Sequence, residues 1–233
     1  MKDIFKDSAK FFGRTILVSL LCFFIVISIM VITVGFFAAP AGYYVTGTKD
    51  GERENLYTYY TADGEDTKYA LYEEQGYTLE KTEIKLVPES SERTSYIISQ
   101  LFCLAILYSF IYPYFWDRGY RDRNLAQTGN IKGNKLRGLF VGLLTIAPWG
   151  ILLLALHKVQ GLAISLLMFI CPIFYPTIKI ITKGTIYYSQ LSIPMLLGVV
   201  ACLFVIPLFS WLGYYLGFKD YSIMEKITFV KSK

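Results

Sequence analysis

The sequence has few of the side chains from which metal sites and acid–base catalysts are built. It contains one histidine, His157, and four cysteines that each stand alone inside an apolar stretch: Cys22, Cys103, Cys171 and Cys202. Without a second histidine or a Cys-x-x-Cys pair, zinc and thiol-redox motifs are excluded. Nucleotide-binding glycine loops are absent as well. We therefore expect no metal, no cofactor and no enzymatic activity, although folding could still bring a partner to His157.

Acidic residues are missing from every long apolar stretch. Proton-coupled transporters and intramembrane aspartyl proteases place an ionisable group at membrane depth, so this absence argues against both classes.

Long apolar stretches dominate what is present. The chain is 54% hydrophobic and only 18% charged, with mean hydropathy +0.43, and four stretches are long and uncharged: residues 15–37, 96–116, 138–156 and 191–217. A helix over residues 15–37 would reach roughly 34 Å, enough to cross a hydrocarbon layer of about 30 Å. The pattern predicts an α-helical integral membrane protein with four transmembrane helices. The first stretch is longer than a secretory signal core, so an uncleaved anchor is favoured over cleavage near Ala39 or Ala41.

A fifth apolar stretch, residues 161–178, is interrupted by Pro172 and Pro176. Each proline removes a backbone donor, which membrane depth tolerates only inside protein. We expect a broken, partly inserted segment. A fifth crossing is the alternative, but it would place the lysine-bearing C-terminal tail outside, against the charge rule.

The charges between the apolar stretches predict the orientation. Residues 38–95 hold 12 acidic and 6 basic residues, whereas the N-terminal tail and residues 117–137 are basic. By the positive-inside rule the N-terminus and 117–137 are cytoplasmic and 38–95 is extracellular. We expect the basic loop to contact anionic lipid or a protein partner, and it is too short for a nucleic-acid module. Its six cations are Arg118, Arg121, Arg123, Lys132, Lys135 and Arg137.

The acidic, tyrosine-rich stretch between the first two spans reads as β structure. Residues 42–47, 55–61, 67–73 and 77–87 are rich in aromatic and β-branched residues and are separated by glycine-containing turns. We expect a small extracellular β-meander of three or four strands, without disulfides because it has no cysteine. The chain then divides into 1–38 (tail and first helix), 39–95 (outer domain) and 96–233 (helical membrane domain).

Two glycine patterns and one amide suggest how the helices pack. Gly138-x-x-x-Gly142 and Gly213-x-x-x-Gly217 match the small-residue pattern of close helix contacts. Gln100 lies inside the second apolar stretch, where an amide must face another helix rather than lipid. Pro148 predicts a kink in the third span.

Three short motifs carry a resemblance. Asp122-Arg123-Asn124, Lys135-Leu136-Arg137-Gly138-Leu139 and the run from Gly213 to Lys219 resemble uncharacterised polytopic membrane proteins of Gram-positive-type bacteria. The resemblance covers mainly the C-terminal half. It implies a setting in a bacterial plasma membrane and implies no activity.

Together these observations predict a non-enzymatic multi-pass membrane protein. We expect an accessory or assembly subunit that contacts a protein partner, or a second copy of itself, through its outer domain and basic inner loop. The alternative is a small membrane transporter or channel that uses the broken segment 161–183, because discontinuous helices line substrate sites in transporters.

Overall fold

The computed structural model describes residues 2–63, 66–129, 134–182 and 185–221. The chain divides into two compact units, which are described separately. The helical unit is Met1–Ile27 with Tyr96–Lys233, and the sheet unit is Ser28–Ser95.

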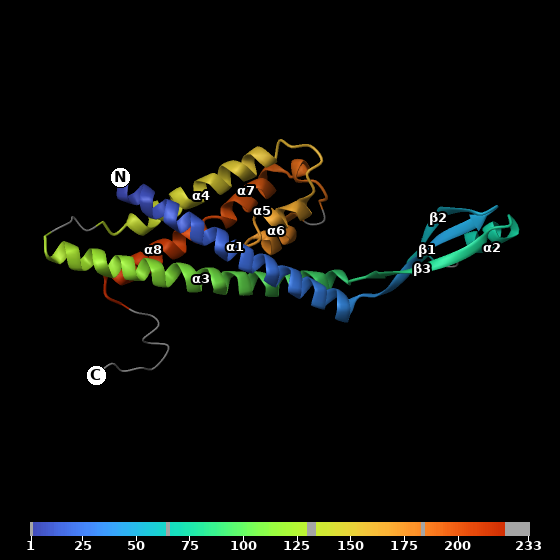
Figure 1. Cartoon of the computed structure of the whole chain (residues 1–233), viewed down its shortest axis with the longest axis horizontal. Coiled ribbons are helices and arrows are strands. Elements are labelled where there is room, and N and C mark those ends of the chain that lie inside the picture. The colour runs from blue at the N-terminus through green and yellow to red at the C-terminus, as the bar shows by residue number, and fades with distance from the viewer. Residues whose placement is uncertain (1, 64–65, 130–133, 183–184, 222–233) are drawn as a thin grey trace. The chain divides into compact units, whose positions relative to one another are not determined.

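Four helical stretches in the described part of the chain are long and apolar enough to cross a membrane (Figure 1). Their most apolar windows are only 22–33% buried, so most of their apolar side chains face outward, as expected for helices in lipid. This arrangement confirms the four predicted apolar helices and indicates a membrane protein. The elements are α1 (Lys2–Phe37), α3 (Glu89–Gln127), α4 (Arg137–Leu156) and the consecutive pair α7 (Ile193–Cys202) and α8 (Val205–Phe218).

Helix α3 extends well past the predicted second span. Most of the segment 117–137, expected to be a loop, continues this helix to Gln127. The apolar stretch ends at the charged residues, but the helix continues through Gly119 and stops only before Gly129, whose φ of +74° suits a helix end. At 39 residues the helix is roughly 58 Å long, almost twice a hydrocarbon layer.

The broken segment is confirmed as a local structure. It consists of a 3₁₀ turn, η2 (Ile164–Leu166), a four-residue helix, α5 (Leu167–Ile170), and a second helix, α6 (Tyr175–Thr182). Only Pro172 lies in the break. Pro176 lies in the first turn of α6, where a missing N–H donor is harmless, so our expectation that it also breaks the helix is wrong.

Backbone hydrogen bonds join the two ends of this broken segment. The Ile164 amide donates to the Ile186 carbonyl at 2.9 Å, and the Tyr188 amide donates to the Leu162 carbonyl at 2.8 Å. The residues after α6 therefore return beside the residues before η2. The short 3₁₀ turn η3 (Tyr188–Gln190) then leads into α7.

Both glycine patterns lie at close helix contacts. Helices α4 and α8 lie side by side (Figure 1). A methyl group on Gly138 would lie 2.5 Å from the Ser210 carbonyl oxygen, and one on Gly217 would lie 2.0 Å from the Trp116 carbonyl oxygen. The first pattern thus packs α4 on α8, and the second packs α8 on α3. This confirms the packing role predicted for them.

The sheet unit holds three antiparallel strands, β1 (Ala39–Lys49), β2 (Glu52–Tyr60) and β3 (Thr78–Leu86). The hairpin between β1 and β2 turns at Asp50 and Gly51, whose φ values of +54° and +84° fit a type I′ turn. The strand order is β2-β1-β3. A meander would keep neighbours in chain order, so that part of our expectation is wrong.

The expected strand 67–73 is instead a helix, α2 (Thr67–Glu74). Asp66 caps it, its side chain accepting the Tyr69 amide at 3.3 Å. This helix separates β2 from β3 and lets β3 reach the far edge of β1. Its side chains follow the helical period: Tyr72 stacks on Tyr57 of the sheet, while Leu71 is 52% exposed.

Candidate functional site

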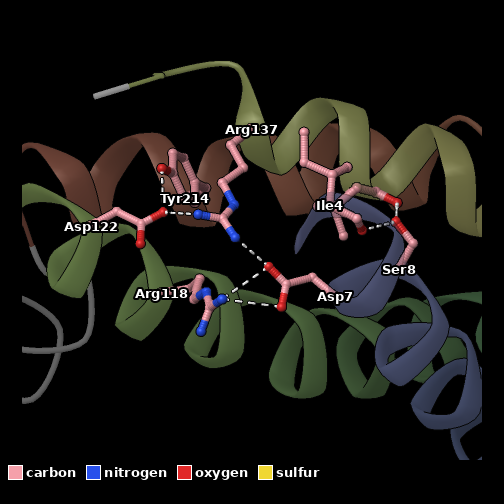
Figure 2. A network of polar contacts seen from close by, with 8 residues as sticks. Ile4, Asp7, Ser8, Arg118, Asp122, Arg137 and Tyr214 are labelled. Atoms are coloured by element: carbon pink, nitrogen blue, oxygen red, sulfur yellow. Dashed lines mark hydrogen bonds and ion pairs between the residues drawn. The ribbon is translucent and has the colours of Figure 1, made fainter. Parts of the chain in front are cut away.

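Five charged or phenolic side chains from four helices meet in the helical unit (Figure 2). Asp7 comes from α1, Arg118 and Asp122 from α3, Arg137 from α4 and Tyr214 from α8. They are the most polar cluster found in the described interior of this unit. We call them the charge network.

The network is a chain of alternating charges. Arg118 Nη2 donates to both Asp7 carboxylate oxygens at 3.1 Å, and Arg137 Nη2 donates to Asp7 Oδ2 at 2.6 Å. The other terminal nitrogen of Arg137 donates to Asp122 Oδ2 at 2.8 Å, and the Tyr214 hydroxyl donates to the same oxygen at 2.8 Å. Two carboxylates face two guanidinium groups, so the formal charges cancel.

These side chains are largely removed from water. Asp7 and Asp122 are 11% and 7% exposed at the side chain, and Arg137 is 17% exposed, whereas Arg118 is 38% exposed. The Nε atoms of both arginines are buried without a hydrogen-bond partner in the described structure. A buried ion pair gains from the low dielectric but only when each charge keeps its partner. The network is therefore sensitive to the loss of any member.

Helical periodicity explains why these polar residues point inward. On α1, Asp7 and the buried residues Phe11, Val18 and Cys22 follow one another at spacings of four, seven and four residues. Positions with such spacings share one face of a helix. The inward face of α1 thus continues past the apolar stretch and carries Asp7 with it.

Smaller polar contacts join the same helices beside the network. The Ser8 hydroxyl donates to the Ile4 carbonyl at 2.8 Å and lies 3.3 Å from the Val141 carbonyl of α4. Thr145 Oγ1 donates to the Val141 carbonyl at 2.8 Å. Gly119 has no side chain to separate α3 from α8, because a methyl group there would lie 2.2 Å from the Tyr214 carbonyl. The four helices therefore meet closely enough for the charges to pair.

The six cations predicted to contact lipid or a partner have different surroundings in the structure. Arg118 and Arg137 belong to the charge network, and Arg123 pairs with Asp220. Arg121 pairs with Asp117 on the surface at 3.1 Å. Lys135 is exposed, and Lys132 lies outside the described residues. The contact role of the six stays a prediction.

Three members of the network were missed at the sequence level: Asp7, Asp122 and Tyr214. From the sequence alone Asp7 has no assigned role, and Asp122 and Tyr214 appear only within the Asp122-Arg123-Asn124 motif and the run from Gly213 to Lys219. The signal that could have found Asp7 and Asp122 is their place on the buried helical stripe, four residues from Phe11 and from Arg118.

A second polar site holds the broken segment. Gln100 of α3 donates from Nε2 to the Ile173 carbonyl at 3.0 Å. Its Oε1 accepts the Thr177 amide at 3.2 Å and the Thr177 hydroxyl at 2.7 Å. The carbonyl of residue 173 and the amide of residue 177 would pair in a regular helix. The Gln100 amide stands between them and satisfies both, which confirms that it faces another segment of the fold.

In the sheet unit, Asp66 is hydrogen-bonded to two tyrosines. Its carboxylate accepts hydrogen bonds from the Tyr43 and Tyr57 hydroxyls and from the Tyr69 amide. Burial raises the pKa of Asp66, but these hydrogen bonds outweigh burial and hold the pKa below its ordinary value. Burial, followed by the hydrogen bond to Asp66, raises the pKa of Tyr43 to about 12. Asp66 thus fixes α2 on one face of the sheet.

The described residues bring no three histidine, cysteine, aspartate or glutamate side chains together in a way that could hold a metal ion. The ring of His157 lies edge-on to Tyr188, and its Nε2 is 3.3 Å from the Leu191 carbonyl. No protein family, curated protein or solved structure matches this chain. The chemistry of the described residues is therefore the basis for a function.

Proposed function

We propose that this chain is a non-enzymatic multi-pass protein of the plasma membrane that serves as an accessory or assembly subunit. The observation that carries the proposal is the closed charge network. Its carboxylates and guanidinium groups are hydrogen-bonded to one another across α1, α3 and α4, with Tyr214 of α8 closing the chain. Charges used in this way hold helices together, which suits a structural scaffold.

The proposed orientation places the N-terminus and the segment 117–137 in the cytoplasm and residues 39–95 outside. Its support is the charge balance of the segments. Two exposed positions test it: Thr67→Cys in the sheet unit and Thr128→Cys just after α3. An impermeant thiol reagent should label the first in intact cells and the second only after lysis. Labelling in the opposite order would overturn the orientation.

Four crossings with a cytoplasmic tail complete the proposed topology. The tail beyond Tyr221, with its lysines, lies outside the described residues, so its basic charge is the support. Green fluorescent protein and alkaline phosphatase can each be fused after Lys233. Fluorescence without phosphatase activity is expected. Strong phosphatase activity would mean that residues 161–183 cross the membrane.

A protein partner is tested by purification. The tagged full chain, extracted in a mild detergent, should elute by size exclusion with a stoichiometric second protein or as a homo-oligomer, as light scattering and mass spectrometry would establish. Arg121→Glu with Lys135→Glu should weaken that association, because Arg121 and Lys135 are the exposed cations described in the inner segment. A stable monomer in several mild detergents would contradict the proposal.

A small transporter or channel is the second candidate, and the Gln100 site favours it. Discontinuous helices with satisfied backbone groups occur at substrate sites of transporters. Purified protein in liposomes would be tested for flux of ions and small solutes. Flux that is lost in Gln100→Leu but kept in Ser109→Ala would favour this candidate over the accessory subunit.

A further inference from the structure

The two faces of the three-stranded sheet differ. Helix α2 is tied to the face that carries Tyr43 and Tyr57 through Asp66. Because side chains alternate along a strand, Tyr44 and its cross-strand neighbours Thr58 and Thr82 belong to the opposite face. Tyr44 is 52% exposed, and both threonines are exposed. We call this surface the open face.

The open face is hollowed. A trough of about 550 Å³ lies on it, lined by the hydroxyl- and amide-bearing residues Tyr44, Thr46, Asn55, Thr58 and Thr82 together with Val45, Leu56 and Tyr57. Hydroxyl and amide groups both donate and accept hydrogen bonds. Tyrosine rings add flat apolar surface with little rotamer entropy. The volume falls within the range of about 300–1,000 Å³ typical of small-ligand sites.

An ion pair crosses one end of the trough. Arg53 of β2 reaches over the central strand to Glu80 of β3 at 2.6 Å, and its Nη2 lies 3.4 Å from Thr46 Oγ1. The two charges cancel, so the face offers planar polar groups without a net charge. A neutral ligand rich in hydroxyl groups matches this chemistry better than an ionic one.

The dimensions disfavour a protein on this face. Three strands spaced about 4.8 Å apart, over nine residues of about 3.3 Å each, give roughly 430 Å². A stable protein interface buries about 800 Å² on each partner. The edges are unsuited to an added strand as well, because charged residues interrupt both outer strands, such as Glu54 in β2 and Lys85 in β3.

We propose that the open face of the sheet unit binds a neutral glycan. Tyr44 stacks on a sugar ring, with Tyr60, 41% exposed, as the second aromatic of the face. The threonine hydroxyls and the Asn55 amide bond to sugar hydroxyls. The Arg53–Glu80 pair closes one end of the chain of sugars. This activity goes beyond the proposed accessory function and stands on different residues.

The test uses the full chain in lipid nanodiscs. The probes are soluble oligomers of N-acetylglucosamine, of β- and α-linked glucose and of mannose, with oligogalacturonate as an anionic comparison. Saturation-transfer NMR should detect a neutral oligosaccharide, and titration should give saturable binding. Tyr44→Ala should weaken it about tenfold, Thr82→Val about threefold, and Tyr44→Phe about twofold at most. Tyr187→Ala removes a tyrosine of comparable exposure, 40% against 52% for Tyr44, from the helical unit and should change nothing.

Several results would overturn the glycan site. One is the lack of saturable binding by any neutral oligomer at ligand concentrations up to about 10 mM, where even a weak site with a Kd in the millimolar range would be partly filled. Tighter binding of the anionic comparison, or equal loss in Tyr187→Ala, would also overturn it. If the β1 amides exchange fast in Tyr44→Ala, that variant has lost the fold of the sheet, and the binding of Tyr60→Ala is measured in its place. If Tyr44→Ala releases a co-purifying protein, the face is a protein interface and the glycan proposal fails while the accessory function stands.

Discussion

Removing the Asp7 carboxylate should destabilise the helical unit more than removing any surface carboxylate. In Asp7→Ala, Arg118 and Arg137 both lose their shared acceptor. Breaking a buried pair by removing one partner typically costs about 3–5 kcal/mol. Arg137 keeps its ion pair with Asp122, and Arg118 is 38% exposed, so water can hydrate it. Both facts reduce the expected loss of stability. We expect a loss of about 3 kcal/mol.

Thermal unfolding in detergent, followed by size-exclusion fluorescence after heating, measures the effect. At about 2–4 °C per kcal/mol for a chain of this size, Asp7→Ala should melt about 6–12 °C lower. Asp7→Asn keeps the shape and one acceptor and should fall between. Asp117→Ala breaks the exposed pair with Arg121 and should shift melting by about 1 °C or less. If Asp7→Ala melts within 2 °C of the wild type by this scale, the network does not hold the helices.

Two further predictions concern backbone contact and pH. Gly217→Ala places a methyl group 2.0 Å from the Trp116 carbonyl oxygen and should lower the melting temperature sharply, whereas Gly13→Ala meets nothing within 4 Å and should not; equal melting of the two would refute the contact. The lowered pKa of Asp66 stabilises the sheet unit above its unfolded pKa of about 3.9, and this stability is lost as the pH falls through the lower folded value. The protection of the β1 amides, relative to their intrinsic exchange rates at each pH, should therefore fall at acid pH, and Asp66→Asn should remove that dependence. At alkaline pH, stability should fall between the ordinary pKa of Tyr43 and its raised value of about 12, which absorbance of the phenolate would follow.

The long helices and all three strands of the sheet could be predicted from the sequence because their signals are local. Uncharged runs of about twenty residues have few other solutions in lipid. The Asp50-Gly51 turn fixes the hairpin between β1 and β2. The packing glycines Gly138 and Gly213 were found by spacing, although spacing alone does not reveal which helix each one contacts.

The prediction of a strand at residues 67–73 was wrong because the hydrophobic pattern of this segment fits both the period of a strand and that of a helix. Tyr69 and Leu71 suggest alternation, but Tyr69 and Tyr72 also fit one helical face. Asp66 decides between them, because its side chain caps the N-terminus of the helix. The wrong strand then concealed the crossover that places β3 beside β1.

The pairings within the charge network could not be derived from local pattern because its members are up to 207 positions apart, from Asp7 to Tyr214. Summing charges over the N-terminal tail sets the orientation of a membrane protein but hides which face each charge occupies. Arg118 and Arg137 were recognised as basic residues, but their pairing depends on α1 and α4 meeting α3. Tertiary packing, which glycines allow at Gly119 and Gly138, is needed to turn surface cations into buried ones.

The Gln100 site gives a prediction for the broken segment. Gln100→Leu keeps the volume of the side chain but removes the donor to the Ile173 carbonyl and the acceptor of the Thr177 amide and hydroxyl. Unsatisfied backbone groups in an apolar setting cost about 1–3 kcal/mol each. Helix α6 can recover part of this by pairing residue 173 with residue 177 directly, so the net loss should be about 2 kcal/mol. Ser109→Ala, on the exposed side of α3, removes only a bond to the Ala105 carbonyl and should have little effect.

Hydrogen exchange distinguishes lost stability from a changed local structure. In the wild type the Thr177 amide should exchange slowly, because Gln100 Oε1 accepts its proton. In Gln100→Leu that amide should exchange faster, while amides in the middle of α4 keep their rates. Unchanged protection at Thr177 together with unchanged melting would show that the α6 backbone does not depend on Gln100. Faster exchange confined to the start of α6 would locate the weakness where the Gln100 amide stands between the Ile173 carbonyl and the Thr177 amide, which a regular helix would pair directly.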